Sequence, residues 1–386
     1  MCTRWITEKR AVPILQQLIR IRTTQPYGDE LDAVKYIRSL FTEKNLEFHI
    51  VDHGKNRASV VLTLPGENRN EAVAVAGHMD TLGLCGTEKW EHSPFGADFQ
   101  DGNIYGRGAA NMKGGITSVI LALREIIEEQ RRPPRDIIFC LTADGDMSGI
   151  GARVLTNNGF LQKAKAMIFA EPTDCKIGIA QKGALWLRIK VYGKRGHACL
   201  PSLGSSAFEG LLCLIQEFKK IIHRIGSHPL LGNSTLVLTQ INGGEAINSV
   251  PEFVEATLDI RTLPSFSNEE ILNAFDRLAK KICNKNNLLE ITISVENNRP
   301  AVGMDKEAPF CIKLQKIIQS FSIEGETRGL LYFTDVNRMI PALGIPFAII
   351  GPGKDIYSFP SDEHVSIDSV LLASKIFKKF FLLDEL

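Results

Sequence analysis

The sequence lacks several features that mark common protein classes. None of its eight cysteines forms a CxxC pair, no apolar stretch approaches the length of a membrane span, and the formal net charge is only +1. Scattered cysteines predict reduced, mostly buried thiols. A nearly neutral chain has no field that would attract nucleic acid or an acidic membrane. We therefore expect neither of these as a partner.

The start of the sequence, Met1-Cys2-Thr3-Arg4-Trp5, has no apolar run followed by a small-residue cleavage site. We expect no signal peptide and hence a cytoplasmic protein. The length of 386 residues, with 44% hydrophobic and 23% charged residues, suits a globular chain of two domains.

The first part of the chain alternates helical and strand patterns. Apolar residues at helical spacing cover 12–21, 31–41 and 116–127, and short buried-strand patterns cover 72–76, 136–141 and 166–170. Helical patterns at 310–318 and 369–381 flank a further strand at 347–350. This alternation predicts a layered α/β domain with a mostly parallel central sheet, built from 1–182 and 297–386.

The middle of the chain has a different rhythm. Its order is β-α-β-β-α-β, with strands expected at 185–191, 234–239, 253–260 and 289–295 and helices at 208–222 and 269–282. This is the order of a ferredoxin-like α+β module. We expect it to be an inserted domain at 183–296, serving as a lid or in dimerisation.

Polar clusters follow four of the expected strands and turns. They are Gly77-His78-Met79-Asp80, the glycine-rich run from Gly106 to Gly115, Thr142-Ala143-Asp144-Gly145-Asp146, and Ala170-Glu171-Pro172-Thr173. A histidine and an aspartate two residues apart point to the same side of a strand end. His78 could bind a metal, and Asp80 could orient it.

These motifs, taken in order, resemble the zinc metallopeptidases and amidohydrolases that include acetylornithine deacetylase, succinyl-diaminopimelate desuccinylase, aminoacylase and glutamate carboxypeptidase. The resemblance covers nearly the whole chain and includes, further on, Gln181-Lys182-Gly183, Gly196-His197-Ala198, Asn248-Ser249-Val250-Pro251, Asp259-Ile260-Arg261, Thr334-Asp335 and Gly351-Pro352-Gly353. It implies amide cleavage next to a carboxylate-bearing amino acid. Two zinc ions would share an aspartate and a water, and a glutamate would take the proton from that water.

Some of the implied roles fall on suitable residues. His78 and Glu171 match ligands of a first metal site, and Asp80 matches the residue that orients the histidine. Asp146 matches a ligand of a second metal site, although its side chain is shorter than the usual glutamate.

Other roles fall on residues that cannot perform them. The bridging aspartate is replaced by Asn111, the proton-transferring glutamate by Gly145, and the last histidine ligand by Phe359. An amide has no negative charge with which to bridge two dications. The lost histidine would lie four residues before Glu363 in the closing motif, residues 357–363, and His364 follows this motif at an offset that does not fit that position. We therefore expect a degenerate centre, with no fully occupied metal and at most one weakly bound zinc.

The inserted domain keeps its matching residues. The resemblance implies that His197, Asn248 and Arg261 contact the substrate, with Arg261 binding its carboxylate and His197 acting catalytically, often across a homodimer interface. The alternative is that they are inherited surface or dimer contacts. Cys199 and Cys85 are conceivable nucleophiles, but small structural cysteines are the simpler interpretation.

Three hypotheses follow. In the first, the protein binds an N-acyl or peptidyl amino acid, has lost two-zinc hydrolysis and performs metal-independent transferase, condensing or lyase chemistry. In the second, it is a non-catalytic binding or regulatory protein, a pseudoenzyme. In the third, it is a weak single-metal amide hydrolase, acting as a deacylase or carboxypeptidase.

Overall fold

A computed structural model describes residues 4–84, 89–354 and 361–385. The chain divides into two compact units, one formed by Met1–Ile179, Met304–Arg328 and Thr334–Leu386, the other by Ala180–Gly303 and Gly329–Phe333. The insertion expected at 183–296 lies within this second unit.

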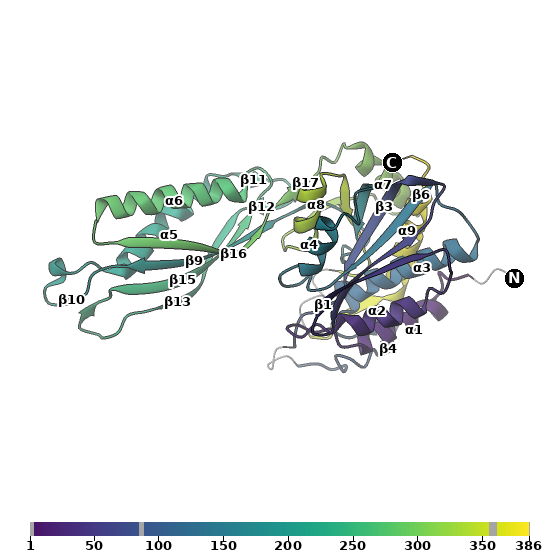
Figure 1. The fold of residues 1–386 in the computed structure, drawn as a ribbon, viewed down its shortest axis with the longest axis horizontal. Coiled ribbons are helices and arrows are strands. Elements are labelled where there is room, and N and C mark those ends of the chain that lie inside the picture. Colours follow the sequence, from purple (N-terminus) through teal and green to yellow (C-terminus); the bar gives the residue numbers. More distant parts are fainter. Residues whose placement is uncertain (1–3, 85–88, 355–360, 386) are drawn as a thin grey trace. The chain divides into compact units, whose positions relative to one another are not determined.

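The first unit is built on a mixed sheet in the order β1-β2-β6-β3-β7-β19-β8 (Figure 1). The four middle strands are parallel, and the strands toward both edges are antiparallel. All eight residues of β6 are buried, as a strand covered on both faces requires. The bounds are β1 Glu47–Gly54, β2 Arg57–Leu64, β3 Asn68–His78, β6 Arg135–Thr142, β7 Ala164–Phe169, β8 Ile177–Gln181 and β19 Phe347–Ile349.

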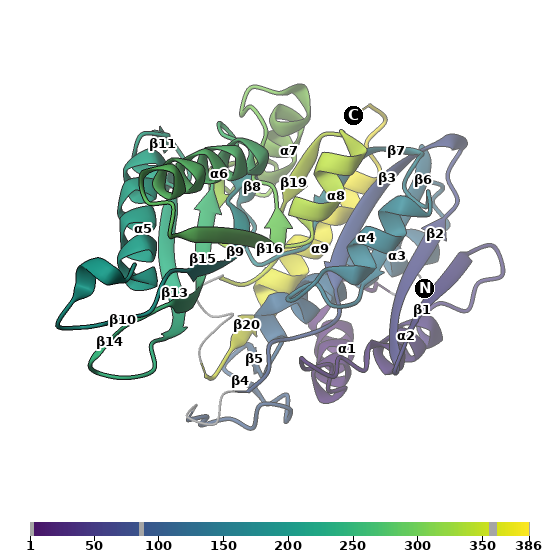
Figure 2. The same ribbon diagram turned by 60° about the vertical axis from the view of Figure 1, so that its left-hand side comes forward.

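Helices cover both faces of this sheet (Figure 2). The connection from β3 to β6 and the connection from β6 to β7 run in opposite directions along the sheet, so right-handed crossovers place their helices on opposite faces. Helix α3 packs with α1 and α9, whereas α4 packs with α8. The bounds are α1 Glu8–Arg20, α2 Glu30–Ser39, α3 Gly114–Glu128, α4 Ile150–Asn157, α7 Pro309–Gln319, α8 Val336–Leu343 and α9 Ile367–Phe381.

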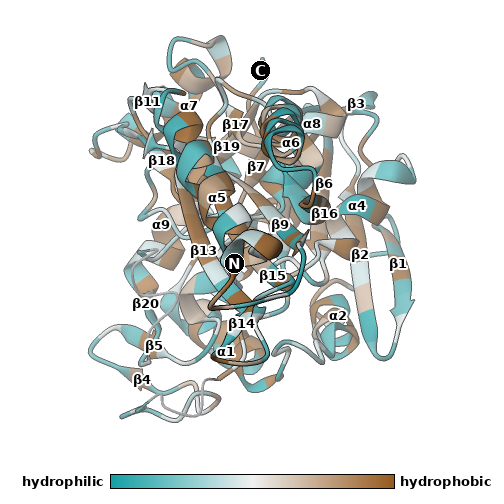
Figure 3. Ribbon diagram, turned by 90° about the vertical axis from the view of Figure 1, so that its left-hand side faces the viewer, coloured by the Kyte–Doolittle hydropathy of each residue, from teal (hydrophilic) through white to brown (hydrophobic). Residues whose placement is uncertain are grey.

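The second unit has a four-stranded antiparallel sheet in the order β13-β15-β9-β16. Helices α5 and α6 pack on it through a core that includes Leu187, Phe218, Leu258 and Phe275. Both helices carry hydrophobic and hydrophilic residues (Figure 3), as helices with one buried face do. The bounds are β9 Gly183–Tyr192, α5 Ala207–His223, β13 Thr235–Gly243, β15 Phe253–Thr262, α6 Asn268–Lys285 and β16 Glu290–Arg299.

The fold class expected from the sequence is confirmed. The large unit is a layered α/β structure with a parallel centre, and the inserted unit has the ferredoxin-like β-α-β-β-α-β order. Among the helices in the described ranges, none is long and apolar enough to span a bilayer.

Shorter elements complete the chain. A small sheet has the order β20-β5-β4, and its strands β4 and β5 precede α3 in the chain. In the second unit, β10 pairs with β14. Strands β17 and β18 both pair with β8. The bounds are β4 Phe99–Gln100, β5 Asn103–Tyr105, β10 Gly196–His197, β11 Ser227–His228, β12 Gly232–Asn233, β14 Ser249–Val250, β17 Val302–Gly303, β18 Thr327–Leu330 and β20 His364–Ser366.

Candidate metal centre

The carboxyl ends of the parallel strands bring three of the predicted clusters to one edge of the sheet. His78 ends β3, the segment from Ala143 to Asp146 follows β6, and Glu171 follows β7. Parallel neighbours place their carboxyl ends side by side. Residues far apart in the sequence therefore meet at one buried place.

His78 is buried and is held through its Nδ1 atom. Nδ1 lies 2.9 Å from the backbone carbonyl oxygen of Asp80 and 3.5 Å from its carboxylate Oδ1. A carbonyl oxygen can only accept, so Nδ1 carries the proton and Nε2 is the atom left for a metal. Asp80 is therefore in contact with the nitrogen of His78 that faces away from the proposed metal, and its orienting role stays a prediction.

The carboxylate of Asp80 is already engaged by other donors. The Gly145 N–H donates to its Oδ1 (2.7 Å), and the Asp146 N–H (3.1 Å) and the Gln25 side-chain amide (2.7 Å) donate to its Oδ2. Burial would raise the pKa of Asp80, but the hydrogen bond to His78 and these donors lower it to about 2. Asp80 can be grouped with His78 and Asp146 as a metal cluster. Its engagement favours an orienting role over ligation.

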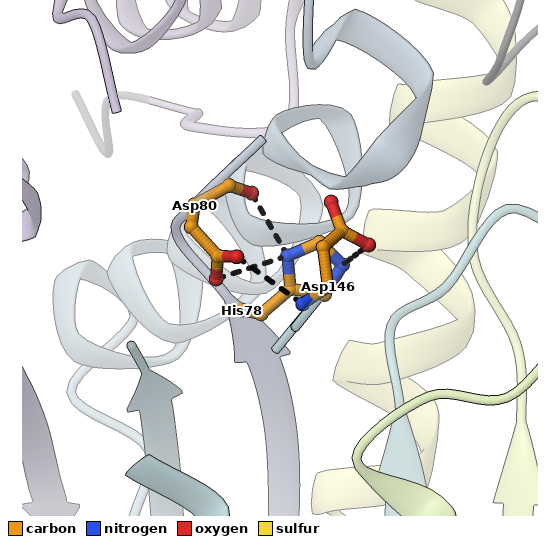
Figure 4. Close-up of side chains that lie close together, drawn as sticks. All are labelled: His78, Asp80 and Asp146. Carbon is orange, nitrogen blue, oxygen red and sulfur yellow. Dashed lines mark hydrogen bonds and ion pairs between the residues drawn. The ribbon is translucent and has the colours of Figure 1, made fainter. Parts of the chain in front are cut away.

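Three oxygen atoms surround His78 Nε2. They are Asn111 Oδ1 at 3.2 Å, Asp146 Oδ1 at 3.8 Å and Glu171 Oε1 at 3.9 Å. Figure 4 shows Asp80 and Asp146 on opposite sides of the imidazole. The carboxylate of Asp146, which we expected to belong to a second site, therefore lies close to the first-site histidine.

Ligand atoms around a four-coordinate zinc with bonds of about 2.1 Å stand about 3.4 Å apart, and the three oxygens lie 3.2 to 3.9 Å from Nε2. Among the described residues, His78, Asp80 and Asp146 lie close enough together to hold one ion, and this group does not include Glu171. The second carboxylate oxygen of Glu171, Oε2, is buried without a hydrogen-bond partner. A cation in the cluster would compensate that buried acceptor.

The pKa shifts in the cluster indicate that its carboxylates favour a bound positive charge. Burial raises the pKa of Glu171 to about 8, and the nearby carboxylates of Asp146 and Asp335 add to this effect. Burial alone would lower the pKa of His78, but Asp146 and the neighbouring carboxylates hold it well above its usual value. Without a metal, protons bound to these side chains therefore offset the negative charge of the carboxylates.

Gly145 lies directly against His78. An ideal Cβ atom built on Gly145 would lie 2.4 Å from the Cβ and 2.7 Å from the Cγ of His78. Both are far shorter than ordinary van der Waals contacts. The position at which the family resemblance implies a glutamate therefore has no side chain, and also no room for one.

Two further carboxylates support this region, and the sequence did not identify them as site residues. Glu363 is buried and accepts hydrogen bonds from the backbone N–H groups of Gly108 (2.9 Å), Ala110 (3.0 Å) and Asn111 (2.9 Å). Burial raises its pKa to about 7, against the effect of these donors and Arg107. Glu363 holds the glycine-rich turn that carries Asn111.

Asp335 is the second of these carboxylates. It accepts a hydrogen bond from the hydroxyl of Thr142 (2.5 Å), at the end of β6. It is buried and is close enough to Glu171 to raise the pKa of that residue. The Thr334-Asp335 motif was the available signal in the sequence.

Two further residues were considered at the closing motif. Phe359 lies outside the described residues. The ring of His364 lies 5.0 Å from that of Tyr105, and its Nδ1 lies 2.9 Å from the carbonyl oxygen of Asp362. These contacts belong to the pairing of β20 with β5.

In the second unit, His197 and Asn248 lie together at one end of the sheet. His197 pairs with Ser249 across β10 and β14, and the Ala198 N–H donates to the carbonyl oxygen of Asn248 (2.9 Å). Both side chains are exposed. Figure 1 shows β10 beyond the ends of β9 and β15.

Arg261 lies toward the other end of the same sheet. Arg261 lies eight positions along β15 from Phe253, which at ~3.3 Å per residue is about 26 Å. Arg261 donates to both carboxylate oxygens of Asp259 (2.8 and 2.9 Å) and lies over the ring of Phe333. Arg261 therefore has an internal anionic partner, and within one chain it does not converge with His197.

The comparison with known families agrees with this geometry. A family model described as peptidase family M20/M25/M40 matches residues 74–383, most of the chain. This chain belongs to that family. The resemblance inferred from the motifs is thereby confirmed.

Individual relatives are distant in sequence but cover nearly the whole chain. A Staphylococcus aureus protein named as a probable succinyl-diaminopimelate desuccinylase is 26% identical, with 97% of each chain covered. The aminopeptidase PepT of Bacillus cereus has a TM-score of 0.80 at 18% identity, with 98% of each chain covered. The YXEP protein of Bacillus subtilis, described as a dinuclear metal binding peptidase, has a TM-score of 0.73 at 16% identity, with 97% of each chain covered.

Proposed function

We propose that this M20-family chain binds one divalent metal ion and an N-acyl or peptidyl amino acid, and that it lacks the two-zinc amide hydrolysis of its family. The packing of Gly145 against His78 carries this proposal. The family resemblance assigns the proton-transferring glutamate to this position, and a side chain there would collide with a metal ligand. Loss of a general base lowers a rate by roughly a hundred- to ten-thousandfold.

The residues that would hold the ion are His78 and Asp146, with the Glu171 carboxylate and the Asn111 amide oxygen at 3.9 and 3.2 Å from His78 Nε2 as further donors. When bound, such an ion polarises a carbonyl oxygen and lowers the pKa of a coordinated water. His78 is oriented by Asp80, and the buried carboxylate of Glu171 would bring negative charge to the ion. The neutral Asn111 supplies no charge for bridging to a second ion, which supports a single-ion centre.

Ligand binding rests on Arg261. Its guanidinium is partly exposed and is oriented by Asp259 and the face of Phe333. A planar guanidinium held in this way can bind a carboxylate through two parallel hydrogen bonds. We keep the substrate class from the sequence, an amino acid derivative with a free carboxylate.

The exposed end of the second unit supports a homodimer. Leu200, Leu203 and Ile247 are 54%, 62% and 105% exposed beside His197 and Asn248. Grouped apolar side chains of this kind mark contact surfaces. In a homodimer the His197 end of one chain would be available to the metal centre of the other. Light scattering on the purified protein tests whether the homodimer forms. A monomer at micromolar concentration would reject it.

The second candidate function is a weak single-metal amide hydrolase, which the oxygen donors near His78 Nε2 favour. Metal-independent transferase, condensing or lyase chemistry stays a hypothesis that rests on the missing base alone. Metal analysis combined with assays on N-acyl amino acids and dipeptides separates these functions. One ion with no turnover supports the proposal, slow chelator-sensitive turnover supports the weak hydrolase, and two ions with rapid turnover would reject both.

A further inference from the structure

The segment that carries Gly145 and Asp146 is held in an unusual way. Four successive backbone N–H groups, from Ala143 to Asp146, each donate to a side chain instead of to the backbone. Ala143 donates to Ser59 Oγ (3.0 Å), Asp144 to Glu30 Oε1 (3.3 Å), and Gly145 and Asp146 to Asp80. These acceptors come from β2, from α2 and from the segment after β3. Three separate parts of the first unit therefore fix this segment.

Asp144 links the segment to a buried ion pair. Its Oδ1 accepts from Arg57 Nη1 (3.0 Å) and from Gln25 Nε2 (2.9 Å). Arg57 in turn donates two hydrogen bonds to Glu30, from Nε (3.2 Å) and Nη2 (2.9 Å). Glu30 is fully buried, and the Arg57 side chain is 17% exposed.

The contacts form one continuous series of hydrogen bonds and ion pairs that leads to the candidate metal centre. Glu30 pairs with Arg57, Arg57 with Asp144, Asp144 with Gln25, and Gln25 with Asp80, which orients His78. Asp80 also accepts a hydrogen bond from the Asp146 N–H, so this series of contacts positions two of the proposed metal ligands. Charge-assisted bonds in a buried place are strong and directional.

The backbone around Arg57 is shaped to keep the guanidinium in place. Gly28 has a φ of +85°, and a Cβ there would lie 2.4 Å from Arg57 Nε and 2.7 Å from its Cζ. The turn before α2 therefore packs directly on the guanidinium. Only a residue without a side chain allows this cover.

We infer that Arg57, held between Glu30 and Asp144, is a positioning residue that fixes the 143–146 segment and thereby sets Gly145 against His78 and Asp146 beside its Nε2. The inference rests on the proposed function in so far as Asp146 is a metal ligand. It also predicts that Gly145→Glu alone does not restore a base, because four side-chain acceptors hold the segment beside the imidazole.

Hydrogen–deuterium exchange of the metal-free full chain tests the positioning. The variants are Arg57→Gln and Asp144→Asn, and the matched control is Arg69→Gln, which removes a guanidinium paired with Glu47 and Asp136 near the start of β3. We expect the amides of 143–146 to exchange at least tenfold faster in the two variants and unchanged in the control. Unchanged exchange of 143–146 in both variants, or acceleration spread evenly over the first unit, would overturn the inference.

Zinc binding by the same proteins adds an independent readout. Removing residues that orient metal ligands costs roughly 10- to 100-fold in metal affinity. We expect that loss in Arg57→Gln and Asp144→Asn, a smaller one in Arg57→Lys, and an altered cobalt absorption spectrum in the first two. Parental affinity in both variants would overturn the inference. If the parent chain binds no zinc, the proposed function fails, and the exchange experiment still decides the positioning.

Discussion

The Cα atom of Gly145 is packed against the imidazole of His78, so that a Cβ at position 145 would lie 2.4 Å from His78 Cβ. The contact joins the segment after β6 to the end of β3. It ties position 145, where the family resemblance implies a base, to His78, the proposed metal ligand. Any side chain at 145 must displace His78 or the segment.

Gly145→Ala should therefore lower both stability and zinc affinity. Overpacking of a filled site costs roughly 1–3 kcal/mol, and a displaced His78 weakens metal binding. Chemical denaturation of the metal-free protein and zinc competition titrations measure the two effects.

A control for this change is Gly303→Ala in the second unit. The nearest atom to a Cβ there is Pro264 Cγ at 3.2 Å. Parental zinc affinity in Gly145→Ala would show that His78 is not constrained as described.

Glu363→Ala should destabilise the first unit. The change leaves Arg107 buried without this carboxylate and removes the acceptor for three backbone N–H groups before α3. Breaking a buried ion pair costs about 3–5 kcal/mol. Denaturation of this variant, compared with the exposed change Glu307→Ala, measures the cost, and equal stability of the two variants would contradict the role of Glu363.

Arg261→Ala should abolish the thermal stabilisation given by N-acyl amino acids that have a free carboxylate. Arg188→Ala is the matched control, because Arg188 lies on the same sheet and pairs with Glu255 and Glu296 instead. Differential scanning fluorimetry provides the measurement. Equal ligand-induced shifts in both variants would remove Arg261 from the binding site.

The cysteines should differ sharply in reactivity. Cys140 and Cys175 are buried, and burial raises the pKa of each thiol to about 12. Thiolates are the reactive form, so these two should be alkylated only after unfolding, whereas the exposed Cys199 and Cys213 should react in the native protein. Peptide mapping after alkylation checks this, and native labelling of Cys140 would contradict it.

Sequence patterns predicted the long elements well because those elements are periodic or uniformly apolar. The run from Ala72 to Ala76 and the helical spacing in 208–222 correspond to β3 and α5. The hairpin of β1 and β2 was missed, since β1 is a largely exposed strand with mixed side chains. Arg57 begins β2, so its place beside Asp144 could not be inferred either.

The candidate site was predicted in part. The order of strands at the sheet edge brought His78 and Glu171 together as the motifs indicated. The placement of Asp146 beside His78 follows from side-chain hydrogen bonds to four backbone groups, which no local pattern encodes. The pairing of Arg261 with Asp259 was also missed, although both lie in one motif and two residues apart on a strand share a face.

We propose a single-ion centre without a base. Elemental analysis of zinc-equilibrated protein, combined with assays on N-acyl amino acids and dipeptides, tests it most directly. We predict one ion per chain, lost in Glu171→Gln and Asp146→Asn, and turnover reduced at least a hundredfold below that of a hydrolase with an intact centre. Two ions per chain together with rapid, chelator-sensitive hydrolysis would contradict it.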